Sequence, residues 1–177
     1  NGIRVMARYL VERGHQPEGI FAINTRDGVK HLRVPLTDDI SVNMGQVTDE
    51  GEAITAATNG HIWNGYNISV GNPHAVVFVD EMAEIGALSE PPVVRPRDSY
   101  PEGVNVEFVK ITEGNSIQMR VFERGSGETR SCGTGTCAVA LAATLHTKGK
   151  LPATWIINPP GGRLEVSIDG HSNATLT

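Results

Sequence analysis

The sequence of 177 residues contains only two cysteines, Cys132 and Cys137, too few for a structural zinc site or a disulfide-rich fold. Two cysteines five positions apart do not match a pair of zinc ligands. On a helix they face different directions, so we expect no disulfide between them. Reduced thiols are typical of the cytosol, and the sequence therefore predicts a cytoplasmic protein.

Long apolar runs and an excess of positive charge are also missing. No run of about 18 apolar residues exists, so we expect no membrane-spanning segment. Lys and Arg number 15 against 20 Asp and Glu, and the net charge of −5 argues against a nucleic-acid-binding surface, which needs clustered cations. With 39% hydrophobic and 20% charged residues, the chain is expected to be globular.

Two stretches have the pattern of long helices. In NGIRVMARYLVERG, at the start of the sequence, apolar residues recur at helical spacing, and Gly14 is a natural helix stop. The stretch TCAVALAATLHTKGK, with a helix predicted over Thr136–Thr147, is apolar nearly all round, so that helix must be buried on most sides. A short helix is expected within DEMAEIGAL, which begins at Asp80.

Much of the remaining sequence alternates between apolar and polar residues between turns, as strands do. The predicted strands are GVKHLRV, DISVNM, YNISV, HAVVFV, GVNVEFVKI, SIQMRVFE, ATWII and GRLEVSI. Many strands and one wholly apolar helix favour an α+β fold in which a sheet is rolled around a central buried helix.

The starts of the two long helices resemble each other. Asn1-Gly2 opens the first helix and Thr134-Gly135 opens the second, with Cys132 two residues before Thr134. The repeat therefore predicts a cysteine two residues before Asn1, in the parent protein. The sequence identity between the two helices is low, and the alternative is a chance likeness, since any helix can begin after a glycine.

Cys132 stands in a glycine-rich turn, RSCGTGTC, between a strand and the buried helix. The first backbone N–H groups of a helix have no partner within the helix, and with the helix dipole they favour negative charge. A lowered pKa is therefore predicted for Cys132, as in an acid–base or nucleophilic thiol. The alternative is a buried structural cysteine, which is our interpretation of Cys137.

Several other polar residues lie at predicted strand ends, where binding clefts commonly form. Asn72 and His74 precede an apolar strand, Asn105 lies within GVNVEFVKI, and Glu123 and Arg124 follow a strand. A purely structural role is the alternative for these residues. Glu123 and Arg124 can form an exposed ion pair, and His74 can be a hydrogen-bonded core residue.

The stretches ERGSGETRSCGTGTCA, SVGNPHAVV, PEGVNVEFV and NGIRVMARYL together resemble the diaminopimelate epimerase family, in an order and spacing that run from Asn1 to Gly162. The resemblance implies two pseudo-symmetric halves, each a mixed sheet rolled around a central helix. Residues 1–34 would be the remnant of the first half and residues 35–177 the second half. It also implies an isomerase without cofactor or metal, and leaves a homodimer open.

The implied substrate is a small molecule, diaminopimelate, whose LL and meso forms two cysteines interconvert in lysine and peptidoglycan-precursor biosynthesis. Cys132 matches the cysteine of the second half. The family's opening motif, Cys-Gly-Asn-Gly, places the other cysteine two positions before Asn1. His74 and Glu123 match positions that support catalysis. Substrate-binding positions are matched by Asn1, Gly133 and Thr134 at the reacting carboxylate, and by Asn72, Asn105, Glu123 and Arg124 at the distal end.

Two other interpretations stay open. A proline racemase or hydroxyproline epimerase uses the same two-cysteine logic, but its ring substrate offers no distal ammonium and carboxylate for Glu123 and Arg124. The second interpretation is a non-catalytic binding protein, or a thiol redox switch, with the same fold. Since the sequence holds only one of the two acid–base cysteines, we expect residues 1–177 alone to be inactive.

Overall fold

The computed structural model describes residues 2–25 and 28–177 of the chain. Its helices are α1 (Gly2–Glu12) and α2 (Gly133–His146), with two short 3-10 helices, η1 (Met82–Ile85) and η2 (Arg97–Ser99). The strands are β1 (Gly19–Thr25), β2 (Gly28–Val34), β3 (Ser41–Gln46), β4 (Thr48–Thr58), β5 (His61–Ser69), β6 (Pro73–Phe78), β7 (Val93–Arg95), β8 (Asn105–Ile111), β9 (Ser116–Glu123), β10 (Gly127–Thr129), β11 (Ala153–Asn158), β12 (Leu164–Ile168) and β13 (Asn173–Leu176).

In the described part of the chain, all 13 strands belong to one sheet with the order β1-β2-β3-β13-β12-β11-β9-β8-β6-β5-β4-β7, and β10 pairs with β9. The β6–β8 and β9–β11 pairs are parallel, whereas the other pairs are antiparallel. This mixed sheet with two α-helices confirms the predicted α+β class. Among the same residues, no helix is long and apolar enough to cross a membrane.

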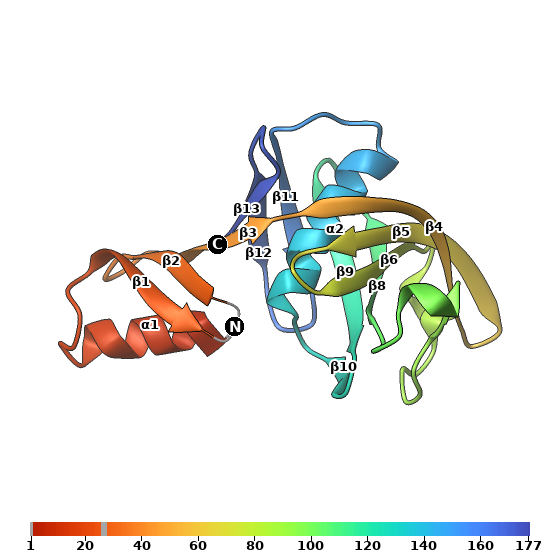
Figure 1. The fold of residues 1–177 in the computed structure, drawn as a ribbon, viewed down its shortest axis with the longest axis horizontal. Helices are drawn as coiled ribbons and strands as arrows, with labels where there is room; N and C mark the ends of the chain where they lie inside the picture. Colours follow the sequence, from red (N-terminus) through yellow and green to blue (C-terminus); the bar gives the residue numbers. More distant parts are fainter. Residues whose placement is uncertain (1, 26–27) are drawn as a thin grey trace.

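The structure has a small lobe with α1, β1 and β2, and a larger lobe that surrounds α2 (Figure 1). In the small lobe, Ala7 and Val11 lie one turn apart on one face of α1, and they are buried against Leu32 and Val34 of β2. Val42 of β3 belongs to the same core.

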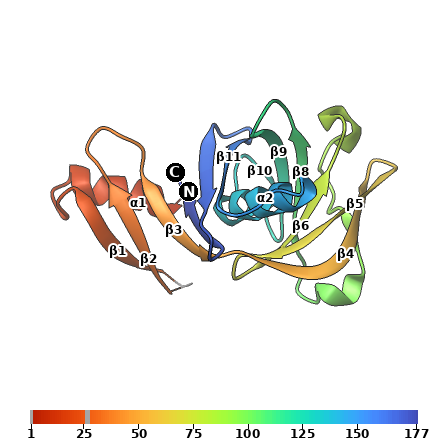
Figure 2. The same ribbon diagram turned by 90° about the horizontal axis from the view of Figure 1, so that it is seen from above.

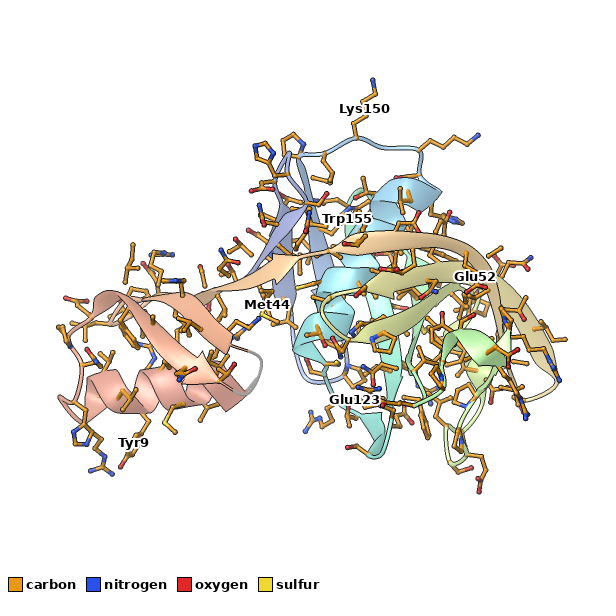
Figure 3. All side chains as sticks on the ribbon, in the orientation of Figure 1. Tyr9, Met44, Glu52, Glu123, Lys150 and Trp155 are labelled. Carbon is orange, nitrogen blue, oxygen red and sulfur yellow. The ribbon has the colours of Figure 1, made fainter. Side chains whose placement is uncertain are left out.

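The other side of α1 is apolar but exposed. Val5, Met6 and Tyr9 are all exposed, and Figure 3 shows Tyr9 pointing away from β1 and β2. The side chain of Met6 is 51% exposed. The small lobe therefore covers only one side of its helix.

Strand β3 joins the two lobes, because it pairs with β2 on one side and β13 on the other. Met44 of β3, labelled in Figure 3, packs against the cores of both lobes. The small-lobe core also extends beyond residue 34 to Ile40 and Val42. The division into residues 1–34 and 35–177 stays a prediction.

Helix α2 lies at the centre of the larger lobe, with strands arranged around it (Figure 2). It contacts β4, β5, β6, β8, β11, β12 and β13, and every residue from Gly135 to Thr144 is buried. Cys137 is fully buried in this core, as the sequence predicted. Small alanine side chains let the surrounding strands approach the helix closely. The hydroxyls of Thr136 and Thr144 donate hydrogen bonds to the carbonyls of Cys132 and Ala140, so they leave no unpaired donor in the core.

The predicted elements agree with the structure where the apolar pattern is strong. The eight predicted strands correspond to β2, β3, β5, β6, β8, β9, β11 and β12, and η1 lies within the short helix expected from Asp80. Helix α2 begins three residues before the predicted Thr136. The sequence missed β1, β4, β7, β10 and β13. The reason is clearest for β4, which begins with the polar run TDEGE and is irregular between Asp49 and Ala53.

Candidate active site

Cys132 is the N-cap residue of α2. Its backbone is extended, with φ −124° and ψ 119°, and its carbonyl accepts the first helical hydrogen bond, from the N–H of Thr136. The Sγ atom accepts a hydrogen bond from the backbone N–H of Gly135 over 3.4 Å. The N–H groups of Gly133 and Thr134, the first two helical residues, have no partner within the helix and are free to bind an anion.

The thiol of Cys132 is a weak acid in this structure. Burial is the main cause, with the negative charge of Glu107 second, and together they raise the pKa of Cys132 to about 12. Hydrogen bonds with Thr134 and Gly135 lower this pKa, while Glu123 raises it further. The lowered pKa predicted from the helix N-terminus is therefore wrong. The thiol is only 6% exposed and a buried carboxylate lies near it, which outweighs the helix N–H groups.

A chain of polar side chains leads from Cys132 into the core. Cys132 Sγ lies 3.5 Å from the hydroxyl of Thr134, to which Asn72 Nδ2 donates a hydrogen bond over 3.4 Å. Asn72 Oδ1 lies 3.1 Å from His74 Nε2. On the other side of the ring, His74 Nδ1 lies 2.7 Å from Glu107 Oε1. Three of the predicted site residues, Asn72, His74 and Thr134, thus form one network with Cys132.

Glu107 is a member of this network that the sequence analysis missed. Neighbouring residues on a strand face opposite ways, so Glu107 and Val109 of β8 face α2, while Val106 and Phe108 face the core on the other side of the sheet. The sequence did contain a signal for Glu107, because it is a single charged residue within the apolar run NVEFV. It is unusual, because a buried charge needs a partner.

Three of the four residues predicted at the distal end, Asn105, Glu123 and Arg124, lie at adjoining ends of β8 and β9. Asn105, the first residue of β8, is buried, and its Oδ1 accepts a hydrogen bond from the backbone N–H of Arg124 over 3.0 Å. Glu123, labelled in Figure 3, accepts a hydrogen bond from the hydroxyl of Thr129. The Arg124 guanidinium lies 4.0 Å from the carboxylate of Glu102. Asn105 therefore fixes the turn that presents Arg124.

Two cavities adjoin these residues. One, of about 650 Å³, is lined by Arg124 together with Tyr100 and Phe122. The other, of about 430 Å³, is lined by Ser131, next to Cys132, and by Arg4 in the first turn of α1. The beginning of α1 thus faces the loop that carries Cys132. Asn1, predicted to bind the reacting carboxylate, lies outside the described residues, and within those residues no group of His, Cys, Asp and Glu is arranged to hold a metal ion.

Comparisons with known proteins identify the relatives of this chain. Residues 66–176, more than half of the chain, match the family model described as diaminopimelate epimerase. The chain is 44% identical over 173 residues to a diaminopimelate epimerase of Streptomyces coelicolor, covering 94% of this chain and 60% of the relative. It is 39% identical over 186 residues to that of Corynebacterium glutamicum, covering 100% and 65%. The chain therefore spans less than two thirds of the length of these relatives.

Solved structures show the same fold at low identity. A hydroxyproline epimerase from Agrobacterium vitis aligns with a TM-score of 0.70 at 16% identity, covering 98% of this chain and 62% of that protein. A PhzF-family phenazine biosynthesis protein from Bacillus anthracis aligns with a TM-score of 0.71 at 13% identity, covering 99% and 70%. These two likenesses support the fold alone. The family model covers residues 66–176, the range in which Cys132 and its polar network lie. The chain belongs to the diaminopimelate epimerase family.

Proposed function

We propose that the complete protein containing residues 1–177 interconverts LL- and meso-diaminopimelate without a cofactor, and that Cys132 transfers a proton on one face of the substrate. The observation that carries this proposal is the position of Cys132. Its thiol caps α2, beside free helix N–H groups, and contacts a buried network that ends at His74 and Glu107. A structural cysteine would need neither of these features.

The raised pKa of Cys132 makes it the proton donor at the start of the reaction. A base on the opposite face removes the α-hydrogen as a proton, and its electron pair stays on the α-carbon and the adjoining carboxylate. The N–H groups of Gly133 and Thr134 stabilise the charge that develops there. The S–H proton of Cys132 then bonds to the α-carbon from the other face, which leaves a thiolate and inverts the centre.

The opposite base is proposed to be a cysteine two positions before Asn1, in the first of two pseudo-symmetric halves. The start of α1 lies against the Cys132 loop at the 430 Å³ cavity, which supports a site between the two helix N-termini. Residues 1–177 alone would hold one acid–base thiol and are proposed to be inactive. A cytoplasmic location and a homodimer are predictions that follow from the family.

The distal end of diaminopimelate carries an ammonium and a carboxylate. We assign its carboxylate to Arg124 and its ammonium to Glu123, with Asn72 and Asn105 completing the hydrogen bonds. Arg124 and Glu123 come from one turn, and Asn105 holds that turn in place. A ring such as proline cannot use these charges, so the charges favour the longer substrate.

The substrate assignment is tested by chiral chromatography of reactions with the complete protein. Separate reactions contain LL-diaminopimelate, L-proline or trans-4-hydroxy-L-proline. We expect the meso isomer to accumulate from LL-diaminopimelate and no inversion of either ring substrate. Inversion of a ring substrate with unchanged diaminopimelate would contradict the proposal. Arg124→Gln should raise KM for diaminopimelate far more than it lowers kcat, because Arg124 binds away from the reacting carbon.

A further inference from the structure

Glu107 and His74 form a buried, hydrogen-bonded pair near the proposed acid. Both side chains are 0% exposed, and Glu107 Oε1 lies 2.7 Å from His74 Nδ1. The second oxygen, Oε2, is buried without a hydrogen-bond partner among the described residues. A half-satisfied carboxylate in a core costs stability, so a role beyond packing explains its presence better than packing does.

The ring of His74 is held from both sides. Its Nδ1 faces the Glu107 carboxylate and its Nε2 faces Asn72 Oδ1, 3.1 Å away. Because a carboxylate oxygen only accepts hydrogen bonds, Nδ1 is the ring atom that donates to Glu107, and this contact fixes that side of the ring. The orientation of the ring, and that of the Asn72 amide, therefore depends on Glu107.

The first turn of α2 is shaped to admit this carboxylate. A Cβ atom added to Gly135 would lie 2.4 Å from Glu107 Oε1 and 3.2 Å from Cys132 Cβ. Any side chain at this position would overlap the carboxylate. Gly135 also donates its N–H to Cys132 Sγ. One residue thus contacts both the thiol and the space that Glu107 occupies.

We propose that Glu107 is a positioning residue for Cys132: it orients His74, Asn72 and Thr134, and it places a carboxylate beside the first turn of α2, next to the thiol. This inference deepens the proposed function, since the thiol is the proposed proton donor. The charged groups that act on the thiol are Glu107 and the weaker Glu123, and Glu107 also bonds to His74. Removing the charge at position 107 should therefore make Cys132 more acidic.

The test measures the rate at which iodoacetamide alkylates Cys132 in the 177-residue chain, followed by mass spectrometry as a function of pH. Glu107→Gln keeps the shape of the side chain and removes its charge. We expect the alkylation profile to move by about one pH unit toward lower pH, which is a roughly ten-fold faster rate at a fixed pH below the midpoint. Cys137, which is fully buried, serves as an internal reference.

A matched control is Glu81→Gln, the same substitution at an exposed residue paired with Lys110. It should leave the alkylation profile of Cys132 unchanged. Gly135→Ala is the second variant, because it displaces the carboxylate without changing any charge. An imidazole N–H proton that bonds a buried carboxylate gives a downfield NMR signal. We expect this signal of His74 in the unmodified chain and its loss in both Glu107→Gln and Gly135→Ala.

An unchanged alkylation profile in Glu107→Gln would overturn the proposal, as would a His74 signal that survives in Gly135→Ala. If Glu107→Gln fails to fold, the Gly135→Ala spectrum alone decides, since an undisturbed His74 would show that the carboxylate does not hold the ring. None of these measurements depends on turnover. The proposed substrate can therefore be wrong while the proposed role of Glu107 is correct. Equally, the role of Glu107 can be wrong while the substrate is correct.

Discussion

Trp155 of β11 donates a hydrogen bond from Nε1 to the hydroxyl of Thr144 on α2, over 2.9 Å, between two buried side chains. The same hydroxyl donates to the carbonyl of Ala140. Trp155 is labelled in Figure 3, beside the strands that surround α2. This contact attaches the end of the helix far from Cys132 to the sheet, so it should stabilise the core without touching the site.

Thr144→Val tests that contact. The change keeps the shape of the side chain but leaves the indole N–H without its acceptor, so we expect the free energy of unfolding to fall by about 1–3 kcal/mol. Urea denaturation measures this loss. Adding Trp155→Phe to Thr144→Val removes the unpaired donor, so the double variant should lose less than the two single losses combined. Strict additivity would mean that the hydrogen bond contributes nothing.

The two cysteines should respond differently to substitution. Cys137→Ala deletes one buried sulfur atom, and we expect it to lower the free energy of unfolding by about 1 kcal/mol. Activity of the complete protein should remain. Cys132→Ser should leave the fold intact and abolish turnover, because a serine hydroxyl is a far weaker acid than a thiol. If Cys137→Ala folds normally but loses activity, the catalytic role has been assigned to the wrong cysteine.

Stability should fall in alkaline solution. Burial raises the pKa of Cys132 and of Cys137 from 9.0 to about 12, so both thiols stay protonated up to a higher pH in the folded chain than in the unfolded chain. The unfolded chain then releases protons first, and the stability present below pH 9 is lost as the pH rises toward 12. Urea denaturation should therefore show that the stability advantage of the unmodified chain over Cys137→Ala shrinks above about pH 8 and reverses in sign by about pH 10.5. A constant difference would contradict the assigned direction.

Thr134→Val should act on the thiol in the direction opposite to Glu107→Gln. The hydrogen bond between Thr134 and Cys132 lowers the pKa of the thiol. Without that hydroxyl the pKa should rise, so alkylation of Cys132 should become slower at every pH below its midpoint. Thr112→Val, at an exposed hydroxyl, is the matched control. Faster alkylation in Thr134→Val would show that the hydroxyl shields the thiol and does not stabilise its anion.

The small lobe should be cleaved before the larger lobe. Helix α1 packs on one side only, and Val5, Met6 and Tyr9 are exposed on the other. Limited proteolysis of the 177-residue chain should trim the first ~30 residues rapidly and leave the part around Cys132 resistant, because cleavage concentrates where packing is poor. Equal protection of α1 and α2 would contradict the division into a remnant and a complete half.

The sequence was most informative where one physical requirement dominated. The run from Cys137 to Leu145 has no polar face, so a buried central helix was predictable, and the strands around it followed from their alternation. Strand β4 was missed, because pairing with β5 and β7 stabilises a sequence that starts with charged residues and a glycine. Such tertiary stabilisation leaves no local pattern in the sequence.

The sequence predicted which residues lie together in the site, but it did not predict the acidity of the Cys132 thiol. Motif spacing pointed to Asn72, His74 and Cys132, and the structure brings them together through Thr134. The acidity of the thiol depends on Glu107, which is 25 residues away from Cys132 in sequence and adjacent only because β8 packs against α2. A local argument from the helix N-terminus therefore had the wrong sign.

The most direct test of the account is hydrogen exchange at the α-carbon of diaminopimelate in heavy water. Mass spectrometry follows deuterium uptake by the substrate with the complete protein and with its Cys132→Ser variant. The account predicts uptake together with inversion by the unmodified protein and loss of inversion in Cys132→Ser. Inversion at a near-normal rate in Cys132→Ser would contradict the claim that Cys132 carries the proton.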